Sequence, residues 1–260
     1  MELDVRQPLV LPPGTGAKLL SDELTVTEWS GAASATPHIH RAHADAFYVV
    51  DGTLEFAGTT LARDGLGYAP PGIVHWFDAR AGRYLNIHAP GGAWARRVRA
   101  RQERRRPTDD EIDSFDAAEG SSPPPPLVLP DEGEALVDDR RTLRIKAALP
   151  ELCVFTFDAR PGYVGPTAHV HRAHVDAFYV LEGELEFELD GERVPAPAGT
   201  WVAAMPGVAH TFRNARDARV RFLNLHAPGM QFDEYLRRQQ AGEDGRRFHE
   251  SFDVYEFDAE

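Results

Sequence analysis

The sequence predicts an all-β protein with two β-barrels in tandem, each followed by a short C-terminal helix. The first observation is a repeat, because the stretch HIHRAHADAFYVVDG at 38–52 returns as HVHRAHVDAFYVLEG at 169–183. Such a duplication indicates two domains of similar size. The second observation is the abundance of short runs rich in β-branched and aromatic residues, separated by glycine and proline. With few helical segments between them, these runs are typical of β-sandwiches and barrels.

In the first half, five segments have the composition of strands and are bounded by turn residues. They are LTVTEW (24–29), AFYVV (46–50), TLEFAG (53–58), GLGYAPPGIVHWF (65–77) and RYLNIHAP (83–90). We expect a hairpin turn at Asp51-Gly52, a dipeptide common in such turns. AWARRVRARQERRR (93–106) contains helix formers and no breaker before Pro107, so it predicts a helix outside the barrel.

The second half follows the same plan of short strands at close spacing. Its strand-like segments are LCVFTF (152–157), AFYVLEG (177–183), ELEFEL (184–189), TWVAAMP (200–206), HTFRN (210–214) and RFLNLHAP (221–228). The segment FDEYLRRQQ (232–240) predicts the exposed helix of this half.

A proline-rich segment, SSPPPP at 121–126, separates the two halves and should act as a stiff spacer. The segment before it contains SFDAAE (114–119), and the chain contains a similar SFDVYE at 251–256. The duplication therefore includes the segment after each barrel. We expect a first barrel at 1–120, a linker at 121–126 and a second barrel at 127–260.

Composition excludes several classes of protein. The net charge of −13 opposes binding to nucleic acid or to an anionic membrane. Seven arginines between Arg96 and Arg106 depart from this balance, and we interpret them as a solvated helix that pairs with the acidic tail at 256–260. The single cysteine, Cys153, lies in an apolar run and should be buried, which excludes an internal disulfide and fits a reducing cytoplasm. With no leader and no long apolar run, we expect a cytoplasmic protein without a membrane span.

Ten of the eleven histidines fall into matched pairs between the halves, which indicates metal binding. His38 and His40 are two apart, so on an extended segment they point to the same face. Asp45 shares a strand face with apolar residues and should enter the barrel interior, where His75 could join it. The second half offers the equivalent set, which is His169, His171, Asp176 and His210.

Three imidazoles and one carboxylate suit a divalent first-row metal and leave positions open for water or substrate. We therefore expect one divalent transition metal in each barrel. The ligand types do not distinguish iron, manganese, nickel, copper and zinc.

The two halves resemble cupin domains, and the whole chain resembles a bicupin. The family's first motif, His-x-His followed by an acid and a glycine, matches His38, His40, Asp45 and Gly52 and, in the second half, His169, His171, Asp176 and Gly183. Its second motif matches Gly199, Gly207, His210 and Asn214, and in the first half Pro70, Gly72 and His75. The resemblance implies two jelly-roll barrels, also called double-stranded β-helices.

Both copies carry aspartate where the family usually has glutamate, and aspartate is one methylene shorter. His43 and His174, two positions earlier on the same strand face, are therefore alternative ligands to Asp45 and Asp176. We prefer the aspartates because their six-residue spacing to glycine matches the motif, and we interpret His43 and His174 as polar residues at the barrel mouth. For His88 and His226, in LNIHAPG and LNLHAPG, we prefer a role in capping the last strand over a role in lining the cavity.

The expected inward residues include phenylalanine and valine but no lysine or arginine, so the cavity favours an aromatic or apolar substrate. Binding of a small dicarboxylate such as oxalate would usually require a fixed cationic side chain in the cavity. The spacing between His40 and Asp45 also resembles that of quercetinase-type bicupins. We therefore expect a metal-dependent dioxygenase that acts on a flavonol-like small molecule, with Asp45 or Asp176 as catalytic base.

Two other classes stay open: a non-oxidative cupin enzyme (isomerase, decarboxylase or hydrolase) and a non-enzymatic bicupin that binds a small molecule. We expect a small-molecule ligand and neither nucleic acid nor membrane as a partner. Pairing of barrel edges between two chains would give a homodimer. The second half has the fuller second motif and the longer strands, so we expect it to hold the better site, and whether both barrels are active stays open.

Overall fold

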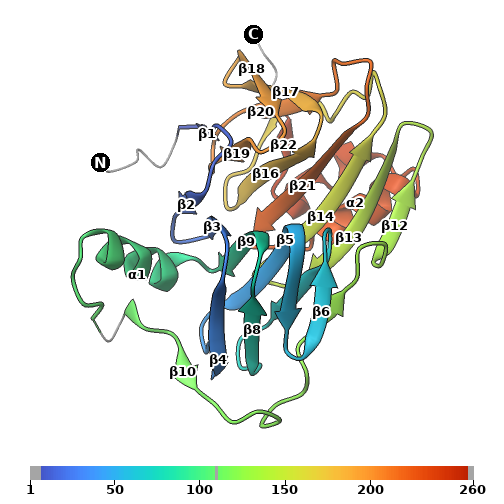
Figure 1. Cartoon of the computed structure of the whole chain (residues 1–260). Coiled ribbons are helices and arrows are strands. Elements are labelled where there is room, and N and C mark those ends of the chain that lie inside the picture. The colour runs from blue at the N-terminus through green and yellow to red at the C-terminus, as the bar shows by residue number, and fades with distance from the viewer. Residues whose placement is uncertain (1–6, 109–110, 257–260) are drawn as a thin grey trace. The chain divides into compact units, whose positions relative to one another are not determined.

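The computed structural model describes residues 7–108 and 111–256 and is shown in Figure 1. The chain divides into two compact units. Residues Thr15–Gly133 contain the first histidine stretch and are called the first barrel. Met1–Gly14 together with Glu134–Glu260 contain the second stretch and are called the second barrel.

The first barrel is built from antiparallel strands around one long strand, β5. Its elements are β2 Gly16–Leu20, β3 Thr25–Ser30, β4 Ala33–Ile39, β5 Ala44–Phe56, β6 Thr59–Ala62, β7 Leu66–Ala69, β8 His75–Ala79, β9 Gly82–Ala89, α1 Gly92–Gln102, β10 Phe115–Asp116 and β11 Leu127–Val128. The strand order is β10-β4-β8-β5-β9-β3-β2, with β6 and β7 also paired to β5. The first part of β5 pairs with β7 and β9, and its second part pairs with β6 and β8.

The prediction of a hairpin turn at Asp51-Gly52 is wrong, because β5 continues through both residues. Its register against β9 shifts between Val49 and Asp51. A bulge of this kind bends a strand and increases its twist, which lets β5 pass from one set of partners to the other. The turn lies instead at Ala57 and Gly58, which have φ values of 48° and 82°, and positive φ at two central residues is what a tight hairpin requires.

The second barrel has two antiparallel sheets that enclose one apolar core. Its elements are β1 Leu9–Leu11, β12 Glu134–Val137, β13 Arg141–Ala148, β14 Cys153–Ala159, β15 His169–Val170, β16 Val175–Glu182, β17 Glu184–Leu189, β18 Glu192–Pro197, β19 Trp201–Ala204, β20 His210–Arg213, β21 Val220–Ala227, α2 Phe232–Gln240, η2 Gly245–Arg247, η3 His249–Phe252 and β22 Tyr255–Glu256. The sheets have the orders β1-β19-β16-β21-β14-β13-β12 and β18-β17-β20-β15-β22. Phe155, Phe178, Phe187 and Phe222 form the centre of the core between them. This is the jelly-roll arrangement expected from the sequence.

Short strands at the ends of each half pair differently from the expected boundaries. β1 pairs with β19 through Leu9 and Ala203, so this segment belongs to the second barrel rather than to 1–120. β11 pairs with β7 through Leu127 and Gly67, so 127–133 belongs to the first barrel. The proline-rich segment is held along the first barrel, because Tyr68 donates its amide to the carbonyl of Pro126. Strands of two or three residues leave no periodic signal in a sequence, which explains the difference.

Helix α1 is shorter than expected, since it ends at Gln102 rather than before Pro107. Arg104 has a φ of 58°, which breaks the helical run. Helix α2 has the expected bounds and buries Phe232, Tyr235 and Leu236. Cys153 is 1% exposed, as expected. The tail expected to pair with the arginines lies outside the described residues from 257 onward. Among the described residues, no helix is both long and apolar enough to span a membrane.

Candidate metal centres

In the first barrel, three strands bring the four predicted residues together. His38 on β4 pairs in register with His75 at the start of β8. His40 follows β4 directly, and Asp45 is the second residue of β5. Each of the four offers one ligand atom, and these atoms all lie within 4.8 Å of one another. All four residues are buried.

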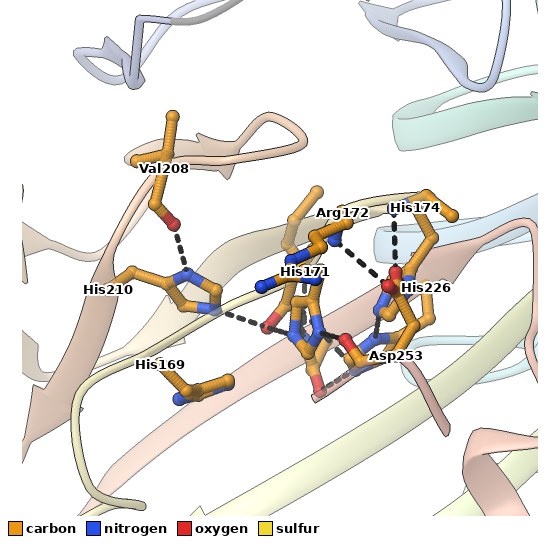
Figure 2. Close-up of polar contacts among 12 residues, drawn as sticks. His169, His171, Arg172, His174, Val208, His210, His226 and Asp253 are labelled. Atoms are coloured by element: carbon orange, nitrogen blue, oxygen red, sulfur yellow. Dashed lines mark hydrogen bonds and ion pairs between the residues drawn. The ribbon is translucent and has the colours of Figure 1, made fainter. Parts of the chain in front are cut away.

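The second barrel repeats this arrangement with its own residues (Figure 2). His169 on β15 pairs in register with His210 at the start of β20. Together with His171 and Asp176, they place their ligand atoms within 4.8 Å of one another, and all are buried. The duplication of sequence is therefore a duplication of geometry.

Backbone carbonyls fix which nitrogen of each imidazole faces the centre. His38 and His75 direct Nδ1 at the carbonyls of Thr36 and Ile73, at 2.8 and 3.0 Å. His40 directs Nδ1 at the carbonyl of Asp113. Because a carbonyl only accepts, each Nδ1 donates its proton and each Nε2 keeps a lone pair. The second barrel orients its rings through the carbonyls of Thr167, Asp253 and Val208.

The donor set fits a divalent metal ion. Nε2 of His40 lies 3.4 Å from Oδ2 of Asp45, and Nε2 of His75 lies 3.2 Å from the same oxygen. In the second barrel, Nε2 of His171 and of His210 lie 3.7 and 3.1 Å from Oδ2 of Asp176. Nε2 of His40 and of His171 are buried and have no hydrogen-bond partner among the described residues. Buried lone pairs beside a carboxylate suit a cation, so each barrel provides a site for one divalent metal.

The electrostatics of the carboxylates favour the same conclusion. Burial alone would raise the pKa of Asp45, but His88, His40 and His75 outweigh it and hold the pKa well below its usual range. Asp176 behaves in the same way. Burial lowers the pKa of His171 to about 4, whereas at His40 burial is outweighed by the hydrogen bond and the charge of Asp45, which raise the pKa. Ionised carboxylate and neutral imidazole are the protonation states that a metal requires.

Comparison with known proteins identifies the fold. Residues 155–226 match the family described as Cupin domain. Oxalate decarboxylase from Bacillus subtilis, solved at pH 4.6, is 16% identical with a TM-score of 0.57, and the match covers 85% of this chain and 76% of that chain. A deletion variant of the same enzyme, OxdC, is 16% identical with a TM-score of 0.56, and the match covers 85% of this chain and 76% of that chain. A third structure of this enzyme, from work on its Mn(II) centres, is 15% identical with a TM-score of 0.56, and the match covers 85% of this chain and 77% of that chain. Matches of this extent include both barrels. The chain therefore has the fold of two cupin-like barrels in tandem. No sequence of a curated protein matches it.

An aspartate after each barrel holds the histidine loop in place. Besides accepting from His171 through its carbonyl, Asp253 uses Oδ1 and Oδ2 to accept the amides of Arg172 and Ala173, at 3.0 and 2.7 Å. Its Oδ2 also accepts Nδ1 of His174 at 2.8 Å (Figure 2). Asp113 makes the same set of contacts in the first barrel.

The sequence did not reveal these two aspartates. Aligning SFDAAE with SFDVYE pairs Asp116 with Asp253, whereas the structure places Asp113 in the position of Asp253. The stacking of Arg41 on Phe115 and of Arg172 on Tyr255 confirms the offset of three residues. The signal that could have found them is the aspartate two residues before an aromatic one near the end of each half.

His88 and His226 do not cap a strand as we had preferred, because both are fully buried beside the metal sites. Nε2 of His88 donates to Oδ1 of Asn86 at 2.8 Å, and Nδ2 of Asn86 donates to Oδ1 of Asp45 at 2.6 Å. Asn224 connects His226 to Asp176 in the same way. Trp94 stacks on His88, and Phe232 stacks on His226.

His43 and His174 do not lie at the barrel mouth either, since they are 2% and 0% exposed. Each forms a second group of three histidines, His43 with His40 and His88, and His174 with His171 and His226. Asp45 and Asp176, in contrast, fall within the four-residue groups. The geometry therefore favours the aspartates as the fourth members of those groups.

The cavities contain arginines, contrary to the expectation of a cavity without fixed cations. Beside His38 and Asp45, a cavity of about 810 Å³ is lined by Arg97 and Arg101 of α1. Beside His169 and Asp176, a cavity of about 400 Å³ is lined by residues that include Arg141. In the first barrel the expectation failed because it counted only strand residues, whereas α1 forms part of the cavity wall. In the second barrel it left out β13, which begins at Arg141. Arg141 is paired with Asp138 at 3.3 Å.

Proposed function

We propose that this bicupin is a metal-dependent enzyme that acts on a small organic carboxylate in a reaction that does not consume dioxygen, of the decarboxylase type. The metal ligands proposed are His38, His40, Asp45 and His75 in the first barrel and His169, His171, Asp176 and His210 in the second. The bound ion would supply Lewis acidity to a substrate oxygen. The first barrel has the larger cavity and is the proposed site of reaction.

Arg97 is the observation on which this proposal rests. Its Nη1 is buried and has no hydrogen-bond partner among the described residues. It lines the same cavity as His38 and Asp45. Burial and the neighbouring Arg101 lower the pKa of the guanidinium, yet arginine stays charged in proteins. A buried guanidinium N–H calls for an anionic partner, and a carboxylate offers matching geometry.

Two further observations support a carboxylate that also carries an apolar body. Trp29, Phe47 and Phe77 also line the cavity, and they pack together as one aromatic group. The similar structures are of oxalate decarboxylase, an enzyme whose name specifies a carboxylate substrate and a loss of carbon dioxide. At 16% identity this likeness supports the fold, and the substrate class comes from Arg97.

The role proposed from the sequence for Asp45 and Asp176 as catalytic bases stays a prediction. Oδ2 of Asp45 faces His40 and His75, and Oδ1 accepts from Asn86. A carboxylate of low pKa that is held at both oxygens is a poor proton acceptor. We therefore propose that the aspartates act first as metal ligands.

Arg97→Ala should lower kcat/KM for a carboxylate substrate by at least about tenfold, because a hydrogen bond to a charged group is lost. The assay supplies Mn²⁺-loaded protein with oxalate and with phenylpyruvate and follows carbon dioxide release beside dioxygen uptake. Arg96→Ala is the matched control, because Arg96 neighbours Arg97 on α1 but is exposed. Its ion pair with Asp22 is a long contact of 3.9 Å between Nη1 and Oδ1, and Asp22 is exposed as well. Equal rates for the two variants would contradict the role of Arg97.

The dioxygenase remains a second candidate because of the same aromatic wall. A flavonol such as quercetin could pack against Trp29 and Phe77, which line the cavity beside His38. The assay separates the candidates. Dioxygen uptake with quercetin and no carbon dioxide from any carboxylate would replace the first proposal by the second.

A further inference from the structure

The first barrel has a second convergence of ring nitrogens beside the four-residue group. His40, His43 and His88 each offer one nitrogen, and these lie within 4.8 Å of one another. The side chains are 2%, 2% and 0% exposed. Nε2 of His40, Nε2 of His43 and Nδ1 of His88 are all buried without a hydrogen-bond partner among the residues described. Three such atoms in one place need an explanation.

The opposite nitrogen of each ring shows where the protons are. Nδ1 of His43 faces the carboxylate of Asp113 at 2.8 Å, so it carries a proton. Nε2 of His88 faces Oδ1 of Asn86, whose amide nitrogen is already turned to Asp45, so it also carries a proton. Nδ1 of His40 donates to the carbonyl of Asp113. In neutral imidazoles the other nitrogen is then a bare lone pair.

In their neutral tautomers, three residues whose ligand atoms lie within 4.8 Å of one another thus each have one buried nitrogen without a partner among the described residues. We propose that His40, His43 and His88 form a second, all-nitrogen metal position in the first barrel, which takes Zn²⁺ or copper in preference to Mn²⁺. Zn–N bonds are about 2.0–2.1 Å, so nitrogens on one ion are up to about 4 Å apart, which is compatible with ligand atoms that lie within 4.8 Å of one another. Imidazole suits zinc and copper, whereas manganese prefers a set with a carboxylate.

The two positions exclude each other. Nε2 of His40 has one lone pair, and it faces Asp45 in the four-residue group as well as His43 and His88. One ion in the first barrel can therefore use His40 either with His38, Asp45 and His75 or with His43 and His88. Trp94 covers this place, with its ring stacked on His88 at 4.1 Å between centroids.

The second barrel provides an internal control. There Nε2 of His174 and Nδ1 of His226 lie 3.0 Å apart in a hydrogen bond (Figure 2). The second barrel has the equivalent group of His171, His174 and His226. The nitrogens of His174 and His226 pair with each other, whereas the corresponding nitrogens of His43 and His88 have no partner among the described residues.

The test counts Zn²⁺ and Mn²⁺ bound by purified full-length variants, by elemental analysis after equilibrium dialysis. His38→Ala removes only the four-residue group of the first barrel, so it should lose one of two Mn²⁺ and keep both Zn²⁺. His38→Ala combined with His43→Ala should lose one Zn²⁺ as well. His38→Ala combined with His174→Ala, the matched control, should still keep both Zn²⁺.

Loss of one Zn²⁺ in His38→Ala alone would overturn the proposal, and so would retention of both in the variant that also lacks His43. His88→Phe in the His38→Ala background gives a second route to the same answer, because a phenyl ring can still stack on Trp94. The inference rests on the role assigned to His40 but not on turnover. Absence of any enzymatic activity would thus leave the metal count as an independent result.

Discussion

Replacing His171 by alanine should remove the metal ion of the second barrel and leave that of the first. The change deletes one of three imidazole ligands beside the carboxylate of Asp176. Loss of a group that only orients a ligand costs about 10–100-fold in metal affinity, so loss of a ligand should cost more. Elemental analysis should report one Mn²⁺ per chain instead of two.

His40→Ala and His249→Ala complete this experiment. His40 belongs to both groups of the first barrel, so its loss should empty that barrel of every metal tested. His249 lies outside both barrels' metal groups and has no counterpart in the first half, so its loss should leave the count unchanged. A full metal complement in His171→Ala would refute the assigned ligands.

The repeated histidines were visible from the sequence because each depends on local spacing. His38 and His40 alternate along one strand, and a fixed distance to glycine places Asp45 on the next. A duplicated motif keeps these spacings, so it predicts which residues meet in each barrel without knowledge of the full topology. The jelly-roll fold follows from the same motif.

The residues that were missed depend on long-range packing instead. Asp113 reaches His43 across 70 positions, and Asp253 reaches His174 across 79. Neither position is set by the period of a strand. Arg97 enters a cavity because α1 packs against β2 and β3, which the composition of an arginine-rich helix does not reveal. Charge alone favoured a solvated helix, and the tertiary fold placed one guanidinium beside the metal site.

Asp253→Ala should both weaken metal binding in the second barrel and destabilise the fold. The change leaves three donors without their acceptor, which are the amides of Arg172 and Ala173 and Nδ1 of His174. Because the amides are exposed enough for water to replace part of the loss, we expect a fall of about 2–4 kcal/mol in the free energy of unfolding. Metal affinity should fall about 10–100-fold, since the loop that carries His171 loses its three contacts with the carboxylate of Asp253, although the main-chain carbonyl that accepts from His171 remains. Urea denaturation and competition with a chelator measure the two effects.

The pH dependence of this effect distinguishes a carboxylate contact from a change in packing. Burial would raise the pKa of Asp253, but the hydrogen bonds from His174, Ala173 and Arg172 outweigh it and hold the pKa below its ordinary value of 3.8. A carboxyl whose pKa is lower in the folded state stabilises the fold at pH values above its pKa in the unfolded state. This contribution is lost as the pH falls through the pKa of the folded state. The difference between wild type and Asp253→Ala should therefore be constant above about pH 5 and shrink below about pH 4. Asp113→Ala should act in the same direction but more weakly, because its side chain is 12% exposed against 6% for Asp253. Glu250 is exposed and lies three positions before Asp253, so Glu250→Ala should show neither effect. A loss of stability in Asp253→Ala that does not depend on pH would mean that packing rather than charge holds the loop.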